Sequence, residues 1–167
     1  MDAGLPDPAT ARFGDPTRAE IVATVAHPDL HKLYDYWRAR GTPGRLPSRR
    51  DIDPLDMGFM LGNLILVDVV RDPDGPAPRF RYRLVGANLV NMLGIEMTGR
   101  MLDDHPDPQF REVAKRVYAR VAEDARPTAA RRDAVVDGRV RRYEAIHLPL
   151  AADGATVDMV LVGMRFG

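Results

Sequence analysis

Histidine is the residue type in this chain that most readily binds metals or transfers protons, and it occurs at positions 27, 31, 105 and 147. His27 and His31 are four residues apart, a spacing that places two imidazoles on one side of a helix. A zinc site needs at least three protein ligands, and neither an H-E-x-x-H motif nor a cysteine supplies the remainder. The sequence therefore predicts surface histidines at these two positions and no metal site.

Other catalytic groupings are also missing from the sequence. The chain contains no cysteine, which excludes disulfides, thiolate metal sites, catalytic thiols and covalent thiol photochemistry. Asp103 and Asp104 are adjacent, so their side chains diverge in an extended backbone. This favours roles in turns or helix caps over general acid–base catalysis by a carboxylate pair. The sequence has no nucleophile elbow, P-loop or G-x-G-x-x-G motif. We therefore expect no enzymatic activity.

Charge and hydropathy restrict the partners that the chain can bind. Its 24 basic and 24 acidic residues cancel, whereas nucleic-acid binders usually carry a basic excess. The longest apolar run, 64–67, is far shorter than the roughly 20 residues of a membrane span, and no secretory signal is readable. We expect a cytoplasmic protein that binds neither membranes nor nucleic acid. Its parts are expected to be a flexible tail at 1–16, a helical segment at 17–41 and one domain at 42–167.

The spacing of apolar residues predicts an α+β fold. Helical stripes are expected at 17–26, 28–40, 53–61, 88–93 and 108–124. Strands are expected at 64–70, 79–85, 127–136, 139–149 and 156–165. This order predicts a five-stranded antiparallel sheet with helices over one face. Because the last strand is apolar on both faces, either the helix at 28–40, which carries the only Trp, or a dimer partner must cover the second face.

The Asp137-Gly138 pair predicts a two-residue hairpin turn, and this turn sets the register of the two strands beside it. Arg131 then lies opposite Glu144 and Asp133 opposite Arg142, so these charges are paired locally. The arginines left over for an acidic partner or an anion are Arg132, Arg139 and Arg141. A solvated sheet face is the alternative interpretation of these three residues.

The same register suggests a ligand site. One face of the hairpin carries Tyr143 and His147 among small residues, a pattern that leaves volume and supplies polar groups. We expect this face to be the inner one, although the opposite face with Ile146 and Leu148 is the alternative. Tyr82 on the neighbouring hairpin and Asn88 at a helix start would complete the ligand-binding set. Alternatively, the tyrosines are core aromatics with bonded hydroxyls.

Several stretches carry a resemblance to a known family. They are Tyr-Trp at 36–37, LPSR at 46–49 followed by DIDP at 51–54, FRYRLVG at 80–86, MTGR at 97–100, and Tyr-Glu at 143–144 followed by LPL at 148–150. In this order they resemble a family of bacterial, mainly alphaproteobacterial, single-domain proteins with the PAS fold, formerly described as a domain of unknown function. The resemblance covers about residues 30–165. Where the family tends to have Gly-Thr, this chain has Gly86-Ala87-Asn88. If the Thr hydroxyl caps the following helix, Asn88 would take over the cap; if it touches a ligand, the ligand of this chain would differ.

The resemblance implies a PAS-like sheet with a flanking N-terminal helix, and a function in signal transduction as a sensor. Ligands of PAS domains lie between the inner sheet face and the helices, and signals pass through the termini or dimer surfaces. A haem-binding PAS domain needs an axial histidine, usually on the long helix. The predicted long helix at 108–124 contains no histidine. Haem and covalent flavin are therefore not expected, and the cofactor remains unidentified.

Two functions follow as hypotheses from the sequence. The first is a PAS-type sensor, a homodimer, that binds an unidentified small molecule, or none, and contacts a signalling protein. The second is a pure protein-interaction adaptor, whose arginine-rich hairpin docks an acidic partner or a cyclic dinucleotide. Neither hypothesis includes a catalytic step.

Overall fold

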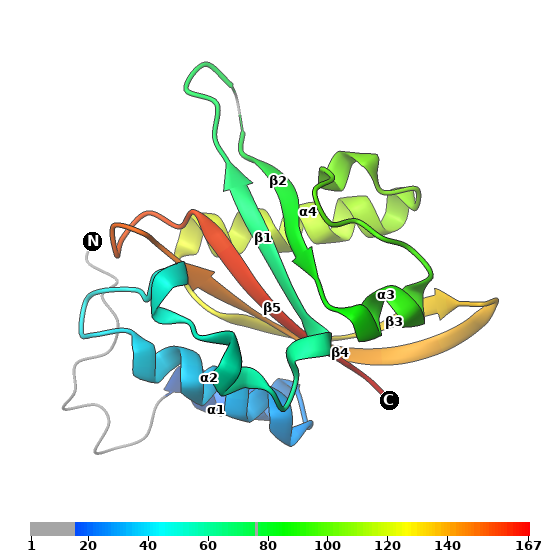
Figure 1. Cartoon of the computed structure of the whole chain (residues 1–167), viewed down its shortest axis with the longest axis horizontal. Helices are drawn as coiled ribbons and strands as arrows, with labels where there is room; N and C mark the ends of the chain where they lie inside the picture. The colour runs from blue at the N-terminus through cyan, green and yellow to red at the C-terminus, as the bar shows by residue number, and fades with distance from the viewer. Residues whose placement is uncertain (1–15, 76) are drawn as a thin grey trace.

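A five-stranded antiparallel sheet organises the chain, and helices lie against both of its faces (Figure 1). The computed structural model describes residues 16–75 and 77–167; most of the expected tail at 1–16 lies outside them. The strands are β1 (Leu64–Val70), β2 (Arg79–Val85), β3 (Thr128–Val136), β4 (Arg139–Leu150) and β5 (Met159–Phe166), in the spatial order β2-β1-β5-β4-β3. The helices are α1 (Pro16–Thr24), α2 (Pro28–Arg40), α3 (Ala87–Leu93) and α4 (Pro108–Asp124). The α+β fold expected from the sequence is confirmed.

Helix α2 covers the outer face of the sheet. Its stripe of apolar residues at helical spacing, Leu30, Leu33, Tyr34 and Trp37, is buried along its whole length. The indole of Trp37 donates a hydrogen bond of 2.8 Å to the carbonyl of Pro149 on β4. Gly163 on β5 allows this close approach, because a Cβ there would lie 2.6 Å from the Leu33 side chain. Helix α2 therefore covers the second apolar face, as the Trp stripe predicts.

The inner face of the sheet packs against α4. His147 on β4 and Val162 on β5 are direct neighbours in the ladder, and the His147 ring contacts Tyr118 of α4 at a centroid distance of 6.2 Å. Ile146 and Leu148 point the other way, toward α2, since Ile146 pairs with Gly163. The structure thus places the Tyr143 and His147 face inside, as expected from the hairpin register.

The hairpin of β3 and β4 is longer than the strand beside it. β5 pairs with β4 only from Tyr143 onward, so residues 133–142 are two-stranded and project from the sheet (Figure 1). This extension and the adjoining Arg131 and Arg132 are here called the ribbon. Its turn has positive φ angles at Asp137 and Gly138, as an Asp-Gly turn requires. The predicted register is confirmed, with Arg131 opposite Glu144 and Asp133 opposite Arg142.

Three local expectations were wrong. The single short helix expected at 53–61 is instead two 3₁₀ turns, at Pro54–Met57 and Leu61–Asn63. Asn88 does not cap α3; Gly86 occupies that position, because the close backbone contact between Gly86 and Gly62 starts the helix earlier. The last strand starts at Met159 rather than 156.

Within the described ranges, no helix combines the length and hydropathy that a membrane span requires.

Candidate ligand pocket

Aromatic side chains fill the space between the inner sheet face and α4. The hydroxyls of Tyr82 on β2 and Tyr118 on α4 lie 3.2 Å apart and share a hydrogen bond. His147 Nδ1 lies 3.2 Å from the Thr128 hydroxyl on β3. The Tyr118 ring stands edge-on to both Tyr82 and His147. Two of the predicted ligand residues, Tyr82 and His147, are therefore buried and bonded to protein groups.

Burial also sets the protonation of these groups. Removal from water raises the pKa of Tyr118 to about 12 and raises that of Tyr82 well above its ordinary value. The same burial lowers the pKa of His147 to about 4. All three side chains are accordingly neutral near pH 7, because the low-dielectric core disfavours their charged forms. The core between the sheet and α4 therefore contains three uncharged ring side chains.

Tyr143 lies farther along the same face, where the ribbon begins. Its ring is half-buried and packs against Phe166 at a centroid distance of 5.4 Å. Burial raises the pKa of Tyr143, while the positive charge of Arg132 opposes the shift. Tyr143 thus adjoins the tyrosine and histidine cluster, and its hydroxyl makes no hydrogen bond to any of the described residues.

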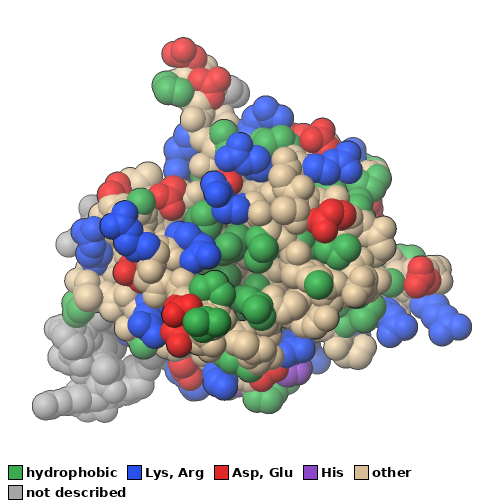
Figure 2. All heavy atoms as spheres, viewed as in Figure 1, with side chains coloured by type: hydrophobic (Ala, Val, Ile, Leu, Met, Phe, Trp, Pro, Cys, Tyr) green, Lys and Arg blue, Asp and Glu red, His purple; other side chains and the backbone are tan. Residues whose placement is uncertain are grey.

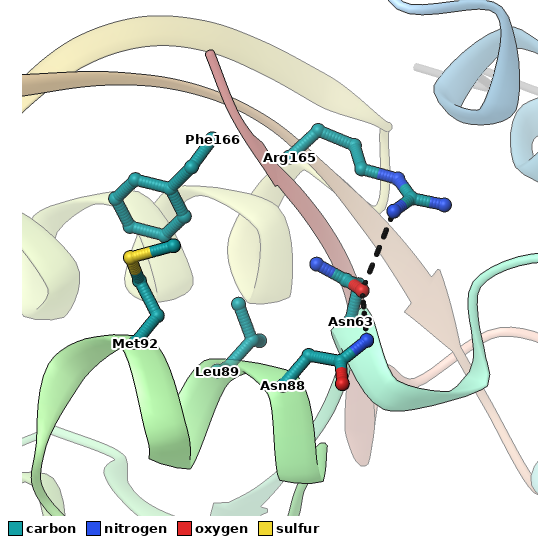
Figure 3. A pocket seen from close by; sticks show the side chains of 6 residues that line it. All are labelled: Asn63, Asn88, Leu89, Met92, Arg165 and Phe166. Carbon is teal, nitrogen blue, oxygen red and sulfur yellow. Dashed lines mark hydrogen bonds between the residues drawn. The ribbon is translucent and has the colours of Figure 1, made fainter.

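Asn88, the fourth predicted ligand residue, lies at a separate pocket at the end of the sheet. This cavity, here called the end pocket, has a volume of about 230 Å³. It is lined by Asn63, Asn88, Leu89, Met92, Arg165 and Phe166. In Figure 3 the apolar side chains stand on one side, and the two amides and the guanidinium stand on the other. The end pocket is therefore amphipathic.

Local backbone packing brings α3 to this position. A Cβ on Gly86 would lie 2.2 Å from the carbonyl oxygen of Gly62, so only glycine permits the two segments to touch. A Cβ on Gly62 would in turn lie 2.6 Å from the Asn88 amide. The paired glycines therefore set Asn88 beside Asn63, which begins the polar side of the end pocket.

A chain of hydrogen bonds crosses the polar side of the pocket. Asn88 Nδ2 donates to Asn63 Oδ1 at 2.9 Å, and Arg165 Nη1 donates to the same oxygen at 3.4 Å. Arg165 Nη2 donates to Asp29 Oδ2 on α2 at 2.5 Å and to the carbonyl of Phe59 at 2.8 Å. The Nε of Arg165 is buried without a hydrogen-bond partner. These contacts connect α3 on one side of the sheet to α2 on the other.

The three predicted anion-binding arginines lie on the ribbon. Arg132, Arg139 and Arg141 alternate with other residues, so they share the face of Tyr143, and all three are exposed. Among the described residues, none of the three has a carboxylate within 4 Å, whereas Arg131 and Arg142 each have one. The structure thus brings the three arginines together on one face and away from the end pocket.

The described residues contain no cluster of three or more His, Asp or Glu side chains that could hold a metal ion. His27 Nδ1 accepts a hydrogen bond from the backbone of Asp29, and His31 Nε2 bonds the carbonyl of Val25. Both rings therefore organise the connection between α1 and α2. Asp103 forms an ion pair of 2.9 Å with Arg79.

Sequence reasoning missed the apolar lining of the end pocket and three polar residues of these sites. Tyr118 lies four residues after Ala114 and three before Val121, both buried on α4, so helical spacing contained its signal. Asn63 and Arg165 gave no signal, because they lie in a 3₁₀ turn and at the end of the last strand, 102 residues apart. Only the tertiary structure brings them to Asn88.

The sheet order, the long helix before the third strand and the helices on the inner face define the PAS fold class. Comparison with family models gives one that is described as PAS domain and matches residues 25–164. This chain belongs to the PAS domain family. PAS domains are in general sensory and signalling modules, and this chain has that architecture.

Comparison with solved structures gives similar PAS and LOV domains. The PAS domain of BvgS from Bordetella pertussis has 22% identity and a TM-score of 0.47, covering 62% of this chain and 75% of that one. A fungal LOV domain photoreceptor has 14% identity and a TM-score of 0.43, covering 71% of this chain and 94% of that one. Comparison with curated proteins gives no match.

Proposed function

We propose that this chain is a sensory module that binds a small molecule in the end pocket, without catalysis, and signals by contact with a partner protein. The observation that carries the proposal is the pocket itself, in which an apolar wall faces two amides and a guanidinium (Figure 3). Ligand sites in proteins combine an apolar lining with a few polar groups that orient the ligand in this way.

The hydrogen-bond chain supports a signalling role for the end pocket. A ligand that accepts a hydrogen bond from Arg165 Nη1 competes with the bond from this nitrogen to Asn63, one of the contacts that connect Asn63, Arg165 and Asp29. Asp29 belongs to the first turn of α2, so pocket occupancy would alter how firmly this helix is held. A ligand shifts an equilibrium only by its different affinity for the two states, and this chain of contacts provides such a difference.

Native mass spectrometry and an absorbance scan of freshly purified protein test the ligand proposal. We expect a retained small molecule, or a raised melting temperature with members of a metabolite library, since a ligand at 100 times its Kd adds about 2.7 kcal/mol. Met92→Trp fills the apolar side of the end pocket and should abolish the effect. Leu55→Trp, at an exposed site away from the pocket, is the matched control. A ligand that binds the Met92→Trp variant equally well would contradict the proposal.

We also propose a homodimer in the cytoplasm. On the outer face of the ribbon, Val135 and Val140 lie opposite each other and are 75% and 71% exposed. An exposed apolar pair on a two-stranded ribbon is a surface that a second copy could cover, and isolated two-stranded ribbons are marginal in water. The mass spectrum above measures the oligomeric state directly.

A second candidate function is an adaptor or anion binder that uses the ribbon. It is favoured by one observation: Arg132, Arg139 and Arg141 share an exposed face, and no carboxylate of residues 16–75 or 77–167 forms an ion pair with them. Figure 2 shows Lys or Arg side chains at the end of the molecule where the ribbon projects. Guanidinium groups bind carboxylates and phosphates through paired hydrogen bonds, so an acidic peptide or a cyclic dinucleotide suits this surface.

Replacing Arg132, Arg139 and Arg141 together by Ser should weaken binding of a polyglutamate peptide or cyclic di-GMP by at least about tenfold at low salt. Fluorescence anisotropy with labelled probes measures the affinity. The matched control is the double variant Arg131→Ser and Arg142→Ser, which removes two arginines from the opposite face of the same ribbon. Equal affinity in the wild type and the triple variant would remove this second function.

A further inference from the structure

The guanidinium of Arg165 has unused hydrogen-bonding capacity beside the end pocket. Its Nη2 makes two short bonds, to Asp29 and to the carbonyl of Phe59. Its Nη1 makes a single bond of 3.4 Å to Asn63, close to the limit for a hydrogen bond, and its Nε makes none. Asn63 Oδ1 already accepts the better bond from Asn88 at 2.9 Å. An oxygen atom entering the pocket could replace the long bond at little cost.

The charges around Arg165 argue against a negatively charged ligand. The carboxylate of Asp29 is in direct contact with the guanidinium. Glu144 lies directly opposite Arg165 on β4, where it accepts hydrogen bonds from the backbone of Ala26 and His27. The carboxylate of Asp29 therefore already pairs with this cation, and an anion entering beside it would meet like-charge repulsion. A neutral acceptor still receives a charge-assisted hydrogen bond from the guanidinium.

Asn88 offers the complementary group. Its Nδ2 is used by Asn63, but its Oδ1 accepts no hydrogen bond from the described residues, and the side chain is exposed to solvent. The polar side of the pocket thus presents an N–H donor from Arg165 and an oxygen acceptor from Asn88. The facing wall consists of Leu89, Met92 and Phe166 (Figure 3).

We propose that the end pocket recognises a neutral carboxamide or lactam attached to a small apolar ring. The ligand carbonyl accepts from Arg165, its N–H donates to Asn88 Oδ1, and its ring packs against Leu89, Met92 and Phe166. This inference rests on the proposed function of the end pocket as the ligand site and specifies the ligand class.

Benzamide and benzoate form the test, because they have the same shape and differ in the charge and hydrogen bonding of one group. Ligand-observed NMR titrations of the full chain should give a Kd for benzamide on the order of 1 mM, as expected for so few atoms. Benzoate should bind at least about tenfold more weakly. Asn88→Leu should reduce benzamide affinity about fivefold, since a hydrogen bond contributes roughly 1 kcal/mol. Asn91→Leu, an exposed asparagine on the same helix outside the pocket, should leave it unchanged.

Three results would overturn the ligand class: equal or tighter binding of benzoate, benzamide affinity unchanged in Asn88→Leu, or no benzamide binding at 10 mM. If benzoate binds as tightly as benzamide and Met92→Trp abolishes the binding of both, the ligand class is overturned while the pocket is supported as a ligand site. Absence of every retained or library ligand in the mass spectra and melting curves would instead count against the proposed function. Circular dichroism of each variant confirms that it is folded before affinities are compared.

Discussion

Replacing Trp37 by Ala should lower the free energy of unfolding by about 4 kcal/mol, the largest single-residue effect that we expect in this chain. Trp37 is 1% exposed, and its indole packs against Tyr34 at a centroid distance of 5.8 Å. Its truncation leaves a cavity between α2 and β4. It also removes the hydrogen bond to the Pro149 carbonyl, so that a buried acceptor loses its donor.

Urea denaturation followed by circular dichroism at 222 nm measures this effect. Fluorescence cannot follow the variant, because Trp37 is the only Trp in the chain. Tyr36→Ala is the matched control, since it removes the neighbouring aromatic ring from the outer side of the same helix, where Tyr36 is only partly buried. We expect the control to lose at most about 1–2 kcal/mol. If the two variants lose similar amounts of unfolding free energy, the packing of Trp37 against the sheet adds little to the stability of the fold, which would contradict the prediction.

The parts of the fold that sequence reasoning predicted are those set by local patterns. The bounds of α2 and α4 follow from Pro at the first turn and a continuous apolar stripe, and both helices start and end where the patterns predict. The register of the ribbon follows from one Asp-Gly pair, because a two-residue turn leaves only one way to align the strands. These features need no knowledge of distant residues.

The end pocket was not predictable in the same way. Asn88 was singled out as a polar residue near a helix start, but its partner was unknown and its assigned role as a cap was wrong. The contact that decides its role is between two glycines, Gly62 and Gly86, whose close approach no local pattern reveals. Arg165 resembles any exposed strand arginine in sequence, and only the packing of α2 beside β5 gives it Asp29 as a partner.

The buried imidazole of His147 should make the fold acid-sensitive between pH 6.5 and pH 4. Burial lowers the pKa of His147 from 6.5 to about 4, and Arg132 adds to this shift while the hydrogen bond with Thr128 opposes it. In this window the unfolded chain binds a proton at residue 147 that the folded chain does not bind. The contribution of His147 to the free energy of unfolding is therefore fully present above pH 6.5. It decreases as the pH falls toward 4, by up to about 3 kcal/mol.

Urea denaturation of the wild type at pH 7.0 and pH 4.5 measures the loss, and His147→Gln should reduce it because Gln does not titrate. His105→Gln is the control for the second histidine, whose pKa partial burial also lowers. That ring stacks on Phe110 near the surface, so its removal should change the pH dependence less. NMR of the folded wild type supplies an independent measurement if His147→Gln does not fold. The Cε1–H signal of His147 should stay at its neutral position down to pH 5, and a midpoint near 6.5 would contradict the argument, because an imidazole that titrates normally cannot be desolvated by the core.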